Sequence, residues 1–397
     1  MWIIISLILL GALFWFFGYR WESKLKRPDI NTLKTLPLVS ILIPAYKSGS
    51  TIKETLESVK NLNYSNKEVI VVNDSPQDKT KQICDNYNVK LIQNNKRMGK
   101  AHALNQAVKK AKGEILFFLD SDTTITKNCL LNLMPWFSNP KTAAVSPKFV
   151  TKNEKKILTR LVSLENHFIS SHFKTHMFFG SLISFNGCGI AIRRSVFEKL
   201  GGWSQTLTED NELAARIIKN NYTIQYEPKA IIKTRGADTI SEIKKQRFRW
   251  GKGAMYSFFH HRKTYSRHLQ FFTNVYVYLL LALAIIGVSL WETVYFLPFL
   301  SIYFIYTLSV KEALLILALF IPIFSNTFTS VTTAAMGHVA ILAYPEKGKH
   351  NYSDLLLIIP YIFFYLPLIN FYYFKGIISG IIDKRKGRDE LNFANWQ

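Results

Sequence analysis

Short apolar runs alternate with longer, more polar stretches between residues 39 and 119. The apolar runs have the length of buried strands, and the stretches between them are helix-like. Strands are expected at residues 39–44, 69–72, 89–92 and 114–119, and helices at 51–60, 77–88 and 100–112. This alternation predicts a mostly parallel, Rossmann-like α/β sheet.

Two later stretches predict amphipathic helices. In the first, apolar residues recur at spacings of four, three and four: Ile157, Leu161, Leu164 and Phe168. This helix either packs on the sheet or lies along a membrane surface. The same two alternatives apply to residues 243–259, and a further helix is expected at 211–220.

Both ends of the chain are strongly apolar. Residues 1–19 carry no charge and are followed at once by Arg20 and further basic residues, which predicts an uncleaved anchor with its N-terminus outside. The stretch 268–382 has room for about four spans. Four spans place Lys347 and Lys349 outside, against the positive-inside rule, so one of the last two spans is alternatively re-entrant or interfacial.

These patterns predict an integral protein of the plasma (inner) membrane with a cytoplasmic central domain. The expected organisation is an anchor at 1–19, a cytoplasmic domain at 20–267 with interfacial helices near 155–180 and 240–262, a membrane region at 268–382 and a cytoplasmic tail at 383–397.

Composition narrows the classes of function. Hydrophobic residues make up 48% of the chain, which excludes a disordered protein. Lys and Arg number 50 against 27 Asp and Glu, and nearly all of the excess lies in residues 20–267. Beside membrane segments, this charge favours lipid headgroups or a nucleotide as partners over nucleic acid. Cys84, Cys129 and Cys188 lack metal-type spacing, which is typical of a reducing compartment.

Polar side chains follow three of the predicted strands. Tyr46 follows the first, Asp74 the second, and Asp120 with Asp122 the fourth. Ligands of parallel sheets bind at the carboxyl ends of the strands, so these residues are candidates for a site. The sequence has neither a G-x-G-x-x-G pattern after the first strand nor a P-loop, which disfavours hydride transfer and ATP hydrolysis.

Three motifs each have a chemical and a structural interpretation. Asp120 and Asp122 either bind Mg²⁺ or Mn²⁺, which bridges carboxylates to a diphosphate, or form a solvated turn. The run Thr208-Glu209-Asp210 either caps the helix that follows or carries catalytic carboxylates. The run Gln246-Arg-Phe-Arg-Trp250 is basic and aromatic, and is alternatively an anchor at a membrane interface.

Taken together and in this order, the motifs resemble a known family. Asp74, Asp120-Ser-Asp122, Thr208-Glu209-Asp210 and Gln246-Arg-Phe-Arg-Trp250 are similar to the D, DxD, TED and QxxRW signature of membrane-embedded family 2 glycosyltransferases. That family includes hyaluronan, chitin, cellulose and poly-N-acetylglucosamine synthases. The resemblance covers roughly residues 37 to 255 and implies a GT-A fold. Asn73-Asp74-Ser75 departs from the family, which often has two aspartates and a glycine there.

The resemblance implies a nucleotide-sugar site at Pro44, Ala45, Tyr46, Asp74, Lys100, Asp120 and Asp122. Within it, Tyr46 stacks on the base, Asp74 accepts a hydrogen bond from uracil, and Lys100 lies near the phosphates. Asp120 faces the nucleotide, and Asp122 holds the Mg²⁺ or Mn²⁺ ion.

The resemblance also implies a catalytic pair and an acceptor site. Asp210 is the general base that takes a proton from the acceptor hydroxyl, and Glu209 supports it. Residues implied to contact the diphosphate and the acceptor sugar are Cys188, Gly189, Gln246, Arg249 and Trp250.

The leading hypothesis is an inverting, processive glycosyltransferase that elongates a β-linked polysaccharide from a UDP-sugar and translocates it across the membrane. A polymer containing N-acetylglucosamine is favoured. The alternative is a single-transfer glycolipid synthase of the ceramide glucosyltransferase type; a polyprenyl-phosphate sugar transferase is a third possibility. From another class, a membrane-bound binding protein or transporter is considered. The expected partners are the UDP-sugar, the growing polysaccharide or a glycolipid acceptor, membrane lipids, and an accessory subunit or a second copy of the chain.

Overall fold

The computed structural model describes residues 25–265, except 26, 34, 76 and 77, together with residues 357 and 360–387. The predicted anchor and residues 268–356 of the predicted membrane region lie outside the described residues. In the described parts of the chain, no helix has both the length and the apolar character needed to cross a membrane. The predicted membrane organisation therefore stays a prediction.

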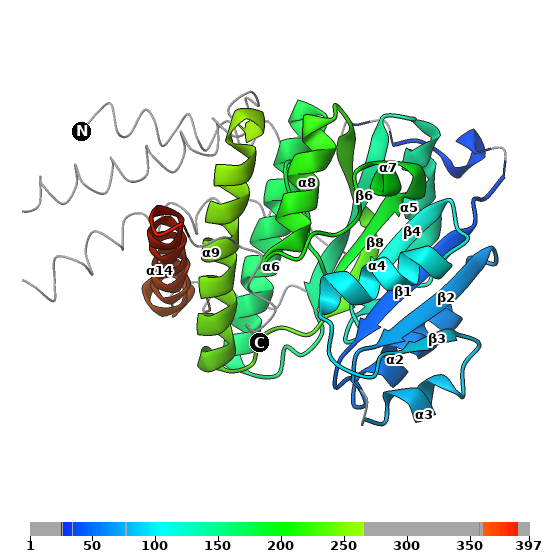
Figure 1. Ribbon diagram of the computed structural model, residues 1–397, viewed down its shortest axis with the longest axis horizontal. Coiled ribbons are helices and arrows are strands. Elements are labelled where there is room, and N and C mark those ends of the chain that lie inside the picture. Colours follow the sequence, from blue (N-terminus) through cyan, green and yellow to red (C-terminus); the bar gives the residue numbers. More distant parts are fainter. Residues whose placement is uncertain are drawn as a thin grey trace, which may run out of the picture.

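One mixed sheet of eight strands forms the centre of the molecule, in the order β3-β2-β1-β4-β7-β6-β8-β5 (Figure 1). The strands are β1 (Val39–Ala45), β2 (Lys67–Asn73), β3 (Lys90–Gln93), β4 (Ile115–Leu119), β5 (Thr124–Ile125), β6 (Thr142–Thr151), β7 (Gly189–Arg193) and β8 (Thr223–Thr234).

The sequence identified β1 to β4, and these four strands pair in parallel as expected. In the other half, β7 runs antiparallel to both β4 and β6, β5 runs antiparallel to β8, and β6 pairs in parallel with β8. The prediction of a mostly parallel sheet is therefore confirmed for the first half only. The strands of the second half come from segments in which the apolar pattern did not predict strands.

The core lies on both faces of the sheet. All five residues of β4 are buried, and Ile41, Leu42 and Ile43 of β1 are fully buried. Strands covered on both faces are expected to be continuously apolar, which explains these runs. Each such side chain contributes about 1.5–3 kcal/mol when fully buried.

The described helices mostly match the expected ones. They are α2 (Ile52–Lys60), α3 (Thr80–Cys84), α4 (Lys100–Lys110), α5 (Cys129–Leu133), α6 (Ile157–His176), α7 (Arg194–Lys199), α8 (Glu209–Lys219), α9 (Ile240–Tyr265) and α14 (Leu366–Arg385). A π-helical turn, Tyr361–Tyr365, leads into α14. The helix expected at 77–88 is much shorter in the structure, where α3 has five residues. The amphipathic helix at 157 is α6, which packs on β6 and β8.

Helix α14 packs closely along α9, on the side away from the sheet (Figure 1). A Cβ at Gly251 would collide with the carbonyl oxygen of Tyr373, and one at Gly376 would collide with that of Phe248. Lys252 of α9 forms a 2.6 Å ion pair with Asp383 of α14, and both side chains are largely buried. The C-terminal helix thereby fixes the helix that carries Gln246, Arg249 and Trp250.

Candidate active site

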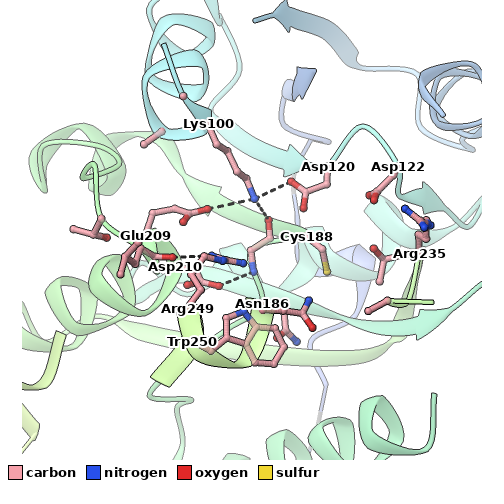
Figure 2. A pocket seen from close by; sticks show the side chains of 18 of the residues that line it. Lys100, Asp120, Asp122, Asn186, Cys188, Glu209, Asp210, Arg235, Arg249 and Trp250 are labelled. Carbon is pink, nitrogen blue, oxygen red and sulfur yellow. Dashed lines mark hydrogen bonds and ion pairs between the residues drawn. The ribbon is translucent and has the colours of Figure 1, made fainter. Parts of the chain in front are cut away.

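A cavity of about 480 Å³ opens at the carboxyl end of β4, between the N-termini of α4 and α8 and the first turns of α9 (Figure 2). A second cavity of about 260 Å³ adjoins it beside the end of β1. The two cavities share five lining residues: Arg97, Gly99, Lys100, Asp120 and Asp122. The sheet edge predicted from the sequence is therefore the place where the polar residues meet.

Lys100 connects the carboxylates of the larger cavity (Figure 2). Its ammonium group lies 2.9 Å from Asp120 Oδ1 and 3.3 Å from Glu209 Oε1, and it donates to the carbonyl oxygen of Gly187 at 3.1 Å. Burial by itself would lower the pKa of Lys100, but the charges of Asp120 and Glu209 raise it above its usual range. Lys100 therefore stays a cation at neutral pH, next to the position predicted for phosphates.

Asp74 holds the loop that presents Lys100. Its Oδ1 accepts hydrogen bonds from Asn94 Nδ2 and the backbone N–H of Met98, both at 2.9 Å. Its Oδ2 accepts from the N–H of Met98 at 2.9 Å and of Gly99 at 2.7 Å. Gly99 has a φ of 91°, a conformation that favours glycine, and α4 begins at the next residue. Asp74 thus shapes this turn, in addition to the base contact predicted for it.

Glu209 and Asp210 open α8, and their pKa values move apart. Burial would raise the pKa of Glu209, but Lys100 and then Arg249 hold it below its usual range. Burial, and then the charge of Glu209, raise the pKa of Asp210 to about 6. Asp210 Oδ2 accepts a hydrogen bond from the N–H of Gly187 at 3.1 Å. Neighbouring carboxyls with divergent pKa values are typical of acid–base sites, and Asp210 is the better proton acceptor of the two.

The alternative in which Thr208 merely caps the helix is not observed. The Thr208 side chain makes no capping hydrogen bond. It packs against Gly253 of α9, so closely that a Cβ at Gly253 would lie 2.5 Å from Thr208 Oγ1. Three acidic residues in the first turn of α8, Glu209, Asp210 and Glu212, are favourably placed against the helix dipole. The N-terminus of α8 therefore presents carboxylates to the cavity.

The two aspartates of the DxD motif differ in their partners. Asp120 is paired with Lys100, and its pKa is raised, first by burial and then by the charge of Asp122, while Lys100 opposes this change. Asp122 accepts a hydrogen bond from Thr123 Oγ1 at 3.2 Å and lines both cavities. Asp122 is therefore the carboxylate that is placed to bind a cation.

The residues present fit a site for a divalent cation whose coordination is completed by substrate phosphates. Among the described residues, no group of three or more His, Cys, Asp or Glu side chains is arranged to hold a metal ion. Mg²⁺ is commonly bound through one or two carboxylates together with substrate phosphates. Asp122, assisted by Asp120, matches that kind of incomplete site, whose remaining ligands are diphosphate oxygens and water.

We therefore predict that Mn²⁺ binds this protein tightly only together with a nucleoside diphosphate. Titration calorimetry should give about tenfold or greater tightening of Mn²⁺ binding when UDP is present, because the phosphates complete the coordination. Asp122→Asn should remove this tightening, whereas Asp85→Asn, at an exposed position directly after α3, should not. Equal Mn²⁺ affinity with and without UDP would contradict a shared site.

The smaller cavity contains the residues predicted to hold the base. Pro44, Ala45, Tyr46 and Asp74 line it, and the residue Tyr46 is 40% exposed. The Arg97 guanidinium carbon lies 4.3 Å from the centre of the Tyr46 ring, an arrangement that stabilises a cation over an aromatic face. Arg97, which the sequence did not single out, is therefore part of the predicted stacking surface.

Helix α9 brings Gln246, Arg249 and Trp250 to the opposite wall of the larger cavity. Arg249 Nη1 donates to the carbonyl oxygen of Leu207 at 2.7 Å, just before α8. Figure 2 shows Arg249 and Trp250 below the Lys100–Glu209 pair, with Asn186 beside Trp250. The cationic Arg249 and the indole of Trp250 thus face the carboxylates across the cavity.

Cys188 and Gly189 have different positions. Cys188 lines the larger cavity, and burial, followed by the charge of Asp120, raises the pKa of its thiol, which favours the neutral form. Gly189 is buried in β7, where a Cβ would approach Ile232 Cδ1 to 2.5 Å. Gly189 is therefore explained by sheet packing and does not line either cavity.

Comparison with known proteins agrees with this geometry. Residues 40–201 match the family model described as glycosyl transferase family 2. The chain contains a family 2 glycosyltransferase domain. The poly-β-1,6-N-acetyl-D-glucosamine synthase of Staphylococcus epidermidis is 28% identical over 256 residues, which cover 61% of this chain and 62% of that protein. The probable glycosyltransferase YdaM of Bacillus subtilis is 33% identical over 240 residues, which cover 56% of this chain and 57% of that protein.

The chain thus spans less than two thirds of the length of these curated relatives. Among solved structures, a mannosyltransferase from Pyrobaculum calidifontis in complex with GDP-Man and Mn²⁺ is similar over 96% of this chain and 99% of that chain. The TM-score is 0.54 at 20% sequence identity, which supports the fold alone. The Rossmann-like GT-A fold expected for the glycosyltransferase domain is confirmed.

Several lining residues of the glycosyltransferase domain were not predicted as site residues. Among them are Arg97, Asn186, Gly187, Arg235 and Arg247. Gly187 and Asn186 directly precede Cys188, and Arg247 lies inside the QxxRW motif at a position that the pattern leaves open. For Arg97 and Arg235 the sequence carries no signal, because loops after different strands bring them to the cavity.

Proposed function

We propose that this chain transfers a sugar from a UDP-sugar to the end of a growing β-linked polysaccharide, with inversion at the anomeric carbon. The observation that carries the proposal is the convergence of Lys100, Asp120, Glu209 and Asp210 in one cavity with Asp122 at its edge. This arrangement offers a cation for a leaving diphosphate and a separate carboxylate for a proton.

In the proposed reaction, Asp210 takes the proton of an acceptor hydroxyl as that oxygen attacks the anomeric carbon. The new bond from acceptor oxygen to carbon forms while the bond from carbon to the diphosphate oxygen breaks, and UDP leaves with both electrons of that bond. Lys100 and Arg249 stabilise the negative charge that develops on the diphosphate. A divalent cation at Asp122 would supply further stabilisation of this charge when bound. Attack opposite to the leaving group converts an α-linked donor into a β-linked product.

N-acetylglucosamine is the proposed sugar. The support is the similarity to the Staphylococcus epidermidis protein, whose name specifies a β-1,6-linked N-acetyl-D-glucosamine polymer. We further propose that transfer is processive, that the polymer crosses a membrane through the apolar segments at 1–19 and 268–382, and that the catalytic domain is cytoplasmic. These finer proposals rest on the sequence pattern.

The second candidate is a single transfer to a glycolipid. It uses the same donor cavity and the same base, so the geometry of Lys100 and Asp210 supports both candidates equally. The distinguishing property is the product, which would be one discrete glycolipid in place of a series of polymers.

The test uses the full chain, purified in detergent or nanodiscs and incubated with Mn²⁺ and one donor at a time: UDP-N-acetylglucosamine, UDP-glucose or UDP-glucuronate. UDP release and product size are measured together. Release with UDP-N-acetylglucosamine and a polymer ladder is the expected result. A discrete lipid-linked product would support the second candidate, and absence of UDP release with every donor would contradict both.

The raised pKa of Asp210 predicts the pH dependence of the reaction. Only the carboxylate accepts a proton, so kcat/KM should fall on the acid side with a midpoint at about 6, by about tenfold per pH unit below it. Above this midpoint the rate should reach a plateau. The measurement is initial UDP release at saturating Mn²⁺ between pH 4.5 and 9, with acid stability checked by returning samples to neutral pH. An acid limb near the ordinary aspartate pKa of about 4 would show that burial does not perturb the base.

A further inference from the structure

Arg247 is a buried cation in the wall of the larger cavity, at a position that the QxxRW pattern leaves open. The residue is 3% exposed, and it is among those that line the cavity. It lies on α9 between Gln246 and Trp250, yet the proposed reaction assigns it no role. A buried guanidinium is costly unless its charge and its N–H groups are compensated, so its partners indicate its function.

Residues of two other helical segments compensate the charge of Arg247. Its Nη2 lies 2.5 Å from Glu165 Oε2 of α6, and 3.3 Å from the hydroxyl of Tyr365 in the turn before α14. The Tyr365 hydroxyl in turn donates to Glu165 Oε2 at 2.6 Å. All three residues are at least nine-tenths buried. Arg247 is therefore fixed by Glu165 and Tyr365, which are 82 and 118 positions away in the sequence.

The opposite side of Arg247 faces Trp250. The guanidinium carbon lies 4.1 Å from the centre of the Trp250 ring, a distance typical of a cation stacked on an indole. Nε and Nη1 are buried and have no hydrogen-bond acceptor within the part of the chain that the structure describes. If Trp250 moved away, these N–H groups would lose the electron-rich ring and remain buried without compensation. The pair should therefore resist any displacement of the indole.

We propose that Arg247 is a positioning residue that acts through Trp250 to set the geometry of the acceptor-sugar site. Glu165 and Tyr365 fix the guanidinium, the guanidinium fixes the indole, and the indole supplies the surface on which the acceptor sugar rests. The turn that leads into α14 thereby takes part in the site through Tyr365, although α14 does not itself line the cavity. The inference rests on the proposed function for the identity of the acceptor as a sugar chain.

The test compares acceptor and donor properties of the full-length protein. A β-linked N-acetylglucosamine tetrasaccharide serves as acceptor, and its binding is measured by calorimetry as well as through KM in the UDP-release assay. Arg247→Met should weaken tetrasaccharide binding by about tenfold or more, in keeping with a desolvated cation–aromatic contact. Donor KM and the slow hydrolysis of UDP-N-acetylglucosamine without acceptor should change several-fold less than the tetrasaccharide affinity, because the proposed effect acts through Trp250. Arg247→Lys should restore only part of the affinity, because a lysine can pair with Glu165 but does not stack as a planar group.

Lys252→Met is the matched control. Lys252 is also a buried cation of α9, paired with Asp383 of α14, but it does not line the cavity. If Arg247 merely stabilised the contact between these helices, Lys252→Met would weaken tetrasaccharide binding equally, and that result would overturn the proposal. The same holds if Arg247→Met affects donor and acceptor alike.

A double-mutant cycle identifies the route of the effect. If Arg247 acts through Trp250, Arg247→Met should cause no further loss of tetrasaccharide affinity in a Trp250→Ala background. Additive losses would refute action through Trp250. If Arg247→Met does not fold, Tyr365→Phe is the variant that tests the proposal. A loss of tetrasaccharide affinity of about threefold would support positioning of Arg247 by Tyr365, and an unchanged affinity would refute it. Calorimetric binding needs no turnover, so a failure of UDP release in wild type would count against the proposed function while leaving the role of Arg247 measurable.

Discussion

Asp210→Asn is expected to reduce kcat for sugar transfer by about 10²- to 10⁴-fold, the range attributed to a positioned general base. An amide of nearly the same shape keeps an oxygen that can accept the hydrogen bond from Gly187, but it cannot take up a proton. The affinity for UDP should stay within about twofold of wild type, because Lys100, Asp120 and Asp122 are untouched. The measurement is single-turnover transfer to an acceptor together with calorimetric binding of UDP and Mn²⁺.

The same substitution should raise stability at neutral pH. The pKa of Asp210 in the folded protein, about 6, lies above its ordinary value of 3.8. The folded state therefore favours the protonated acid, and the stability that this contributes is lost as the pH rises through 6. Asn removes the buried charge, so the variant should unfold at a higher temperature than wild type at pH 7.5 and show little difference at pH 4. A large loss of stability at pH 7.5 would mean that the activity loss reflects misfolding, and Asp85→Asn provides the neutral reference at an exposed site.

Lys100→Met is the second large effect that we expect. Removing the ammonium group leaves Asp120 and Glu209 facing each other without their shared cation, and removes one positive charge from the predicted diphosphate site. We expect kcat/KM for the donor to fall by about 10²- to 10³-fold, the size found for the loss of one preorganised electrostatic contact. The loss should appear in donor binding as well as in kcat, which distinguishes Lys100 from Asp210.

Stability and pH dependence should change together in the Lys100 variant. Breaking a buried ion pair costs about 3–5 kcal/mol, but a side chain that is 32% exposed is screened by water, so a loss of about 2 kcal/mol is expected. Lys100 lowers the pKa of Asp210, so the acid limb of kcat/KM should move to higher pH when the cation is absent. Lys109→Met, at an exposed position on the same helix, should change neither quantity. An unshifted acid limb in Lys100→Met would argue against electrostatic coupling between Lys100 and the base.

The sequence predicted the first half of the sheet because each of its strands contains a short apolar run, and helices separate β1, β2, β3 and β4 along the chain. β1 and β4 are covered on both faces, so burial favours apolar residues at nearly every position, with Ser40 of β1 as a buried exception, and the run is visible without a partner strand. The strands β5, β6, β7 and β8 were missed. β6 and β8 carry buried polar residues such as Ser146 and Glu227, whose partners lie elsewhere in the fold and which interrupt the apolar pattern.

In the site, too, the sequence predicted some residues and only the structure revealed others. Asp120 with Asp122, Glu209 with Asp210, and Gln246 with Trp250 were identified as short motifs in a fixed order, since each motif is local in the sequence. Their convergence on one cavity was an expectation from the resemblance, and the structure places Asp120, Glu209 and Lys100 within ion-pair distance. The contacts of Arg97 with Tyr46 and of Arg247 with Glu165 join distant segments, so no local sequence pattern predicts them.

By itself, the sequence determined the class of chemistry and the elements that carry it, because motif residues and apolar periodicity are properties of neighbouring positions. The tertiary structure alone decided which charges meet. It placed Lys100 between Asp120 and Glu209, separated the pKa values of Glu209 and Asp210 by burial and by the charges around them, and set Tyr365 of the C-terminal segment behind Arg247. Electrostatic interactions depend on distance and on exclusion of water, and both are set by packing between segments that are far apart in the chain.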